Sequence, residues 1–119
     1  MQLNEIGSGN GYGFNSCDNL INCEGKGHAR GINLTNNSAL GYGFRQCTGV
    51  VNCIGTGTTS GTVSGNGVMA GYGFDTIEYA TNCKDGGSTT GMWNGINKNI
   101  DTETCRKTSV TANNATLNA

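Results

Sequence analysis

The chain has 119 residues, enough for one domain, and only 34% of them are hydrophobic, so a large close-packed core of aliphatic side chains is excluded. It contains 21 glycines and no proline, and its net charge of −1 leaves no electrostatic footprint for DNA or RNA. With so few charged residues the chain is not typical of disordered proteins either. What remains is a fold stabilised by backbone hydrogen bonds and by stacking of similar side chains, as in solenoid proteins.

The first ten residues have neither a basic nor an apolar segment, so they do not resemble a signal peptide. We expect residues 1–10 to form a lead-in to the part that follows. No run of about 18 apolar residues occurs, and the sequence therefore predicts no membrane span.

A 30-residue repeat begins at Gly11 and runs through three units without insertion or deletion. Each unit opens with Gly-Tyr-Gly-Phe and continues to an Asn-Cys pair in the same phase. In a layered β fold, equivalent residues stack about 4.8 Å apart, so we expect ladders of aromatic rings, Asn amides and thiols. The predicted ladder residues are Tyr12, Phe14, Asn22, Cys23, Tyr42, Phe44, Asn52, Cys53, Tyr72, Phe74, Asn82 and Cys83.

Within a unit, apolar residues recur every three positions, as at Phe14, Cys17, Leu20 and Cys23. This spacing fits neither one long strand nor a helix, and it predicts very short strands separated by corners. Gly and Asn are expected at the corners because both tolerate left-handed backbone angles.

The second half of each unit repeats poorly, and we expect it to hold one further strand, for example at 32–34, followed by a variable loop. The sequence thus predicts an all-β fold, a parallel β-helix (β-solenoid) of about three 30-residue coils over residues 11–100. Residues 101–119 lack Gly-Tyr-Gly-Phe, and Cys105 is two positions out of phase. We therefore expect this segment to be a non-repeating cap or tail.

Five of the six cysteines occupy two columns of the repeat, and one of these columns accepts Ile77. A position that accepts Ile is apolar, which favours a ladder of buried reduced thiols. Disulfides between stacked neighbours, such as Cys17–Cys47, remain an alternative because the expected spacing permits them. The Cys-x5-Cys spacing and the single His argue against zinc, and no metal or other cofactor is expected.

The Cys- and Asn-rich units that begin at Gly11 and Gly41 resemble repeats in right-handed parallel β-helix regions of bacteriophage and prophage tail-fibre proteins. The resemblance covers about residues 11–91. It implies a rigid, often trimeric shaft or tip that contacts a host surface, and it brings no catalytic residue with it, because the matching motif is structural.

Some β-helix proteins are polysaccharide lyases or hydrolases, whose sites need carboxylates on adjacent coils. The column that starts at Asp18 continues with Thr48 and Glu78, which places its two acids about 10 Å apart with a Thr between them. We expect these acids to be solvated corner residues and assign no catalytic residue.

Ligand contact is more plausible in the variable half of the units. Lys26, His28 and Arg30 form a small basic cluster there, which either touches a glycan or lies in a solvated loop. Trp93 lies in the corresponding part of the third unit. It is either an exposed platform for a sugar ring or a cap on the end of the core.

The sequence and the resemblance together favour a structural module of a phage tail fibre or similar appendage, located in the virion or at the cell surface. Its expected partners are further copies of itself, in a trimer or a head-to-tail assembly, and a cell-surface glycan bound by the variable half-repeats. The alternative is a bacterial surface adhesin or a self-assembling filament subunit, and a glycan-degrading enzyme is the third interpretation. No contact with nucleic acid is expected.

Overall fold

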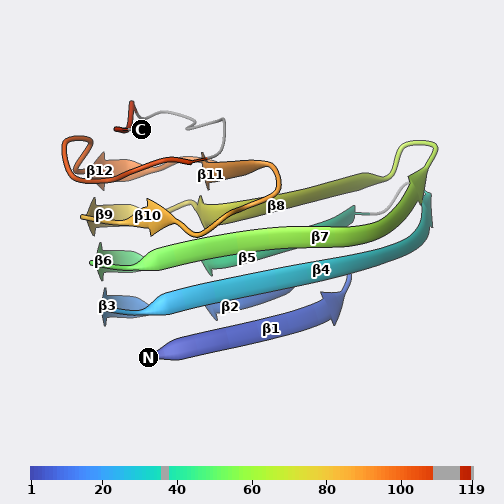
Figure 1. Cartoon of the computed structure of the whole chain (residues 1–119), viewed down its shortest axis with the longest axis horizontal. Helices are drawn as coiled ribbons and strands as arrows, with labels where there is room; N and C mark the ends of the chain where they lie inside the picture. Colours follow the sequence, from blue (N-terminus) through green and yellow to red (C-terminus); the bar gives the residue numbers. More distant parts are fainter. Residues whose placement is uncertain (36–37, 109–115, 119) are drawn as a thin grey trace.

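The computed structural model describes residues 1–35, 38–108 and 116–118, and these residues form twelve strands and no helix (Figure 1). The predicted all-β class is therefore confirmed. The strands are β1 (Gln2–Ser8), β2 (Gly11–Asn15), β3 (Asp18–Ile21), β4 (Glu24–Thr35), β5 (Ser38–Arg45), β6 (Thr48–Val51), β7 (Ile54–Ser64), β8 (Val68–Asp75), β9 (Glu78–Thr81), β10 (Lys84–Asp85), β11 (Gly91–Asn94) and β12 (Lys98–Ile100).

The strands form three parallel sheets of four strands each. Sheet A has the order β1-β4-β7-β10, sheet B the order β2-β5-β8-β11, and sheet C the order β3-β6-β9-β12. From β2 onward the chain visits sheets B, C and A in turn, so that β2, β3 and β4 make a first layer and the next six strands make two more. Figure 1 shows the layers stacked from the N-terminal end to the C-terminal end.

Pairing between layers follows the 30-residue repeat. Tyr12 pairs with Tyr42 and Tyr42 with Tyr72, and Leu20, Val50 and Ala80 are matched in the same way. The side chains follow the backbone register: the Phe14, Phe44 and Phe74 rings stack with centroids 4.9 and 5.0 Å apart, and the Tyr rings stack beside them. The predicted aromatic ladders are present.

Positive φ values occur at the corners between the sheets and within the short strands of sheet C. In the first layer, Ser16 at 58° and Asn22 at 56° lie at the corners on either side of β3, and Asn19 at 56° lies within β3. The expectation of Gly and Asn at the corners is only partly correct, because Ser16, Gln46 and Thr76 adopt this conformation there. Backbone hydrogen bonds to the next layer hold these corners, as from the amide of Gln46 to the carbonyl of Asp75 at 2.9 Å.

One half of each layer is filled with side chains. Its buried cluster contains the Phe column, the two Cys columns and the Val50 column, and extends through the fourth layer. We call this part the side-chain core. Its members are Phe14, Cys23, Phe44, Cys47, Val50, Cys53, Phe74, Ile77, Ala80, Cys83, Met92, Trp93, Cys105 and Leu117.

The other half has almost no side chains between its sheets. Glycines of sheet B face glycines of sheet A so closely that a Cβ added at Gly43 would lie 2.5 Å from the backbone nitrogen of Thr56 and 2.6 Å from the carbonyl oxygen of Gly73. Clashes of this kind recur at every equivalent position. We call this part the glycine arm, and its facing residues are Gly11, Gly13, Gly25, Gly27, Gly41, Gly43, Gly55, Gly57, Gly71 and Gly73.

The glycine arm corrects the prediction of variable loops. The second halves of the first two units are the long strands β4 and β7, which pair in continuous register from Glu24↔Ile54 to Gly31↔Gly61. Residues 1–10 also differ from a simple lead-in, since β1 pairs in parallel with β4 along its whole length. β1 therefore extends sheet A on the N-terminal side of the first layer.

The sequence predicts about three coils over residues 11–100, and the structure adds a fourth layer of strands within that range. Trp93 pairs with Phe74, Lys98 with Glu78 and Ile100 with Ala80, so the fourth layer begins at Gly91. Cys105, predicted to be out of phase, follows the Cys83 column, because the amide of Arg106 donates to the carbonyl of Cys83 at 2.7 Å. The repeat was missed because the arm is cut short: β10 has two residues, and the Asp85 carboxylate then accepts the amides of Gly87 and Ser88 in a tight turn.

Candidate functional site

The predicted basic cluster lies on the outer face of sheet A rather than in a loop. Lys26, His28 and Arg30 alternate along β4 with buried residues, so the three side chains share one face. Lys26 pairs with Glu24 at 3.0 Å, and the two ring nitrogens of His28 lie 2.7 Å from Thr58 Oγ1 and 2.8 Å from Ser60 Oγ. Two of the three side chains are therefore satisfied by neighbours in their own sheet, and Arg30 is the exposed one.

Trp93 is fully buried, so the prediction that it is a sugar platform is wrong and the alternative, a cap on the core, is confirmed. Its ring extends the Phe column, stacked on Phe74 with centroids 4.3 Å apart and an interplanar angle of 14°. Both faces of such a ring are enclosed by the core, which leaves no surface on which a sugar can stack.

The acidic column of sheet C is as the repeat predicts, with Asp18 paired to Thr48 and Thr48 to Glu78. The fourth layer adds Lys98 beside Glu78, a residue that the 30-residue spacing could not place. The two acids are thus separated by one complete strand, and a lysine rather than a third acid lies on the far side.

The thiols of the Cys23 column are enclosed in the core and bond to backbone carbonyls. Cys53 Sγ lies 3.2 Å from the carbonyl of Val51, and Cys83 Sγ lies 3.3 Å from that of Val50. Hydrogen bonds with Cys105 and Cys53, together with burial, raise the pKa of Cys83, whereas the hydrogen bond from Cys83 lowers the pKa of Cys53 to about 7. All six cysteines are free in the structure.

The Asn ladder is present between the second and third layers, where Asn82 Nδ2 donates to Asn52 Oδ1 at 2.6 Å.

In the cysteine column that contains Cys47, burial raises the pKa of the Cys47 thiol to about 11. No group of three or more His, Cys, Asp or Glu side chains within residues 1–35, 38–108 and 116–118 is arranged to hold a metal ion.

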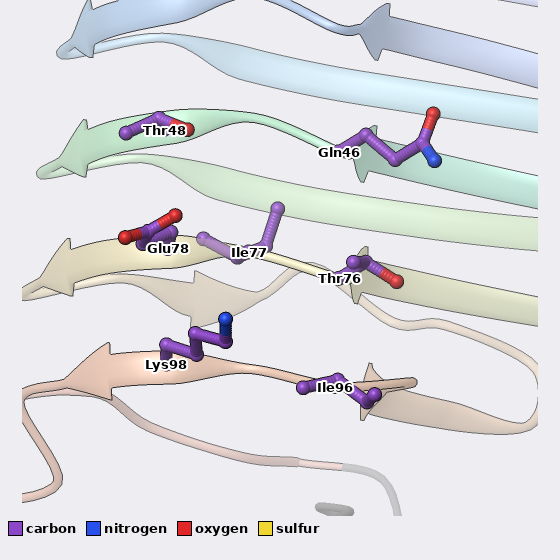
Figure 2. Close-up of a pocket in the computed structure, with 7 residues that line it drawn as sticks. All are labelled: Gln46, Thr48, Thr76, Ile77, Glu78, Ile96 and Lys98. Atoms are coloured by element: carbon purple, nitrogen blue, oxygen red, sulfur yellow. The ribbon is translucent and has the colours of Figure 1, made fainter.

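A groove of 390 Å³ lies at the corner between sheets B and C and crosses three layers (Figure 2). Ile77 is buried at its floor, Glu78 is half-buried, and the remaining residues are exposed. Figure 2 shows them in three rows that follow the second, third and fourth layers. The lining residues are Gln46, Thr48, Thr76, Ile77, Glu78, Ile96 and Lys98.

The sequence did not point to this groove. Glu78 is expected from the repeat to be a solvated corner acid and Ile77 to belong to an apolar column, and Ile96 and Lys98 lie in a layer whose spacing differs from the others. If the repeats are aligned so that the third unit is shorter before Gly91, Lys98 falls in the same column as Glu78.

The chain matches no protein-family model, no curated protein and no solved structure. In the part of the chain that the structure describes, no helix is long and apolar enough to cross a membrane.

Proposed function

We propose that this protein is a β-solenoid module with a structural role in a phage tail fibre or a similar appendage, joined through its N-terminal end to another β-layered unit. The proposal is supported by the resemblance of the repeats and by a difference between the two ends of the stack. In such an appendage the exposed face of β4, with Arg30, would contact the host surface.

The N-terminal end is open. Among the described residues, β2 and β3 are the first strands of their sheets and have no strand on the outer side. The core residues of this layer are also less covered than their equivalents: Cys17 is half-buried where Cys47 is 1% exposed, and Leu20 is half-buried where Val50 is 0% exposed. Unpaired parallel edges beside a partly exposed core are the features that another β layer would cover. This difference between layers is the observation that carries the proposal.

The C-terminal end is closed by the chain itself. Leu117 is buried in the side-chain core, and Asn118 pairs with Arg106 beyond the fourth layer of sheet A. A unit that is open at one end and closed at the other suits the end of a fibre. A filament of unlimited length, the alternative, requires both ends to join.

Size-exclusion chromatography with light scattering tests the proposal. We expect the protein to associate through its open end, and Leu20→Lys, which places a charge in that end, should shift it to smaller species. Thr81→Lys on the exposed outer face of sheet C is the matched control and should leave the size distribution unchanged.

Three results separate the interpretations. A parent protein that is a clean monomer at all concentrations contradicts the proposal, and long polymers favour the filament. A trimer that survives Leu20→Lys shows that the association is lateral and does not use the open end.

A further inference from the structure

One wall of the groove is formed by a single inserted residue, Ile96. Between sheets B and C, the first three layers use two residues at the corner, for example Thr76 and Ile77 between Asp75 and Glu78. The fourth layer uses three, Gly95 to Asn97, although Lys98 still pairs with Glu78. The additional residue is directed outward as Ile96, which is 65% exposed. An apolar wall therefore lies beside a corner that is polar in the layers below it.

The polar side chains of the groove have no partners among the residues that the structure describes. Gln46, Thr48, Thr76, Glu78 and Lys98 make no side-chain hydrogen bond or ion pair with any other described residue. Glu78 and Lys98 are adjacent in register yet are not bonded to each other. Two hydroxyls, an amide, a carboxylate and an ammonium group thus face one shallow space with their bonding capacity unused.

The basic cluster on sheet A differs in this respect. Lys26 and His28 are held by Glu24, Thr58 and Ser60, so a ligand there would have to displace internal bonds. In the groove a ligand would replace only water. The groove is therefore better suited to binding than the site that the sequence indicated.

We infer that the groove binds a short neutral carbohydrate of one or two sugar units. Glu78 only accepts and Lys98 only donates, while Gln46 and the two Thr side chains do both, and a sugar hydroxyl can complement each of them because it donates and accepts. The opposite charges of Glu78 and Lys98 give the groove no net charge, which disfavours an ionic ligand. Ile96, which is exposed, offers an apolar surface for the C–H face of a sugar ring.

The dimensions agree with such a ligand. The volume of 390 Å³ lies within the roughly 300–1,000 Å³ of small-molecule sites. Three layers span about 10 Å, since neighbouring strands are about 4.8 Å apart. The inference goes beyond the structural role proposed above and does not depend on how the module associates.

NMR titration of the full chain with cellobiose, lactose and N,N′-diacetylchitobiose tests the inference. We expect at least one of these neutral disaccharides to shift the amide signals of Gln46, Thr76 and Lys98, with a Kd of about 1 mM as befits a shallow site. Glu78→Gln should weaken binding about tenfold, because a hydrogen bond to a charged acceptor is lost. Ile96→Ala should weaken it about fivefold through the loss of apolar contact.

Asp18→Asn is the matched control, because Asp18 lies in the same column of sheet C as Glu78 but far from the wall formed by Ile96. This variant should bind the disaccharide with the affinity of the parent. Each variant changes an exposed or half-exposed residue, and its thermal unfolding midpoint shows whether it has folded. The inference is overturned if none of the three disaccharides shifts the groove signals, or if Glu78→Gln and Ile96→Ala bind as the parent does. It is also overturned if the acidic sugar sialyllactose binds about tenfold more tightly than lactose. The same samples give their oligomeric state by light scattering, so a failure of binding and a failure of association are seen separately.

Discussion

The side-chain core and the glycine arm occupy the same layers but hold their sheets together in different ways. In the core, aromatic rings, thiols and aliphatic groups fill the space between three sheets, and each stacked aromatic pair adds about 1 kcal/mol to the energy of burial. In the arm, sheets A and B approach until glycine backbones touch, and the buried apolar side chains described there are the small ones of Ala29, Ala39 and Ala70. The arm therefore depends mainly on strand pairing and close backbone contact, and the comparison shows that long paired strands can replace a core of large side chains where the residues between them are small enough.

The largest effect is expected from a break in the core. Phe44→Ala removes a fully buried ring that is stacked on both faces, and it should lower the free energy of unfolding by about 4 kcal/mol. Chemical denaturation measures this. Tyr12→Ala, on the half-exposed aromatic ladder, is the comparison and should cost about 1 kcal/mol. Equal costs at the two positions would show that the core does not dominate stability.

A smaller but still large effect is expected in the arm. Gly43→Ala adds one methyl group where backbone atoms of β7 and β8 leave no room, and it should cost about 3 kcal/mol by forcing the sheets apart. Thr56→Ala changes the outer face of the neighbouring strand and should stay within about 0.5 kcal/mol. If Gly43→Ala were as stable as the parent, the two sheets could not be in backbone contact.

The smallest effect is expected in the pH dependence of the free energy of unfolding, which the buried thiol of Cys47 influences. The pKa of Cys47 is raised to about 11, above the ordinary value of about 8.5 for a thiol in the unfolded chain. The unfolded chain therefore loses this proton first, and stability should fall as the pH rises from about 9 to about 11, by about 1 kcal/mol once screening by water is allowed for. Cys47→Ala should flatten this part of the stability curve, measured by denaturation at several pH values.

A thiol count checks the basis of this last prediction. Thiol titration of the unfolded chain without reductant should give six thiols. Fewer than about five would indicate disulfides between stacked neighbours, whose spacing permits them, and would remove the basis for the titration of Cys47.

The core was predictable from the sequence and the arm was not, for a physical reason. Phe14, Phe44 and Phe74 repeat at 30 residues because rings stack on their own kind, so the period is visible in the residue types themselves. In the arm, the inward positions of β4 are Gly25, Gly27 and Ala29, and an alternation of such small residues with polar ones resembles a loop because no large apolar side chain reveals the buried face.

The fourth layer and the groove escaped prediction for another reason. Their pairing depends on spacing rather than on residue type: the arm loses residues between Asp85 and Gly91, while the corner gains Ile96. Trp93 then replaces Phe in the aromatic column. A search for identical motifs at a fixed interval cannot detect a repeat that changes both its length and its key residue.

The short turn at Asp85 shows that the circumference of a layer is adjustable. Sheets B and C keep their register into the fourth layer although sheet A contributes only the two residues of β10 to the third. The strands of the arm can therefore be shortened, or extended near the turn at Gly65, without disturbing the corners between the sheets. A protein built in this way can alter how far the arm projects sideways while the spacing between its layers stays the same, and a designed peptide inserted at that turn would be displayed at the tip of the arm, away from the side-chain core.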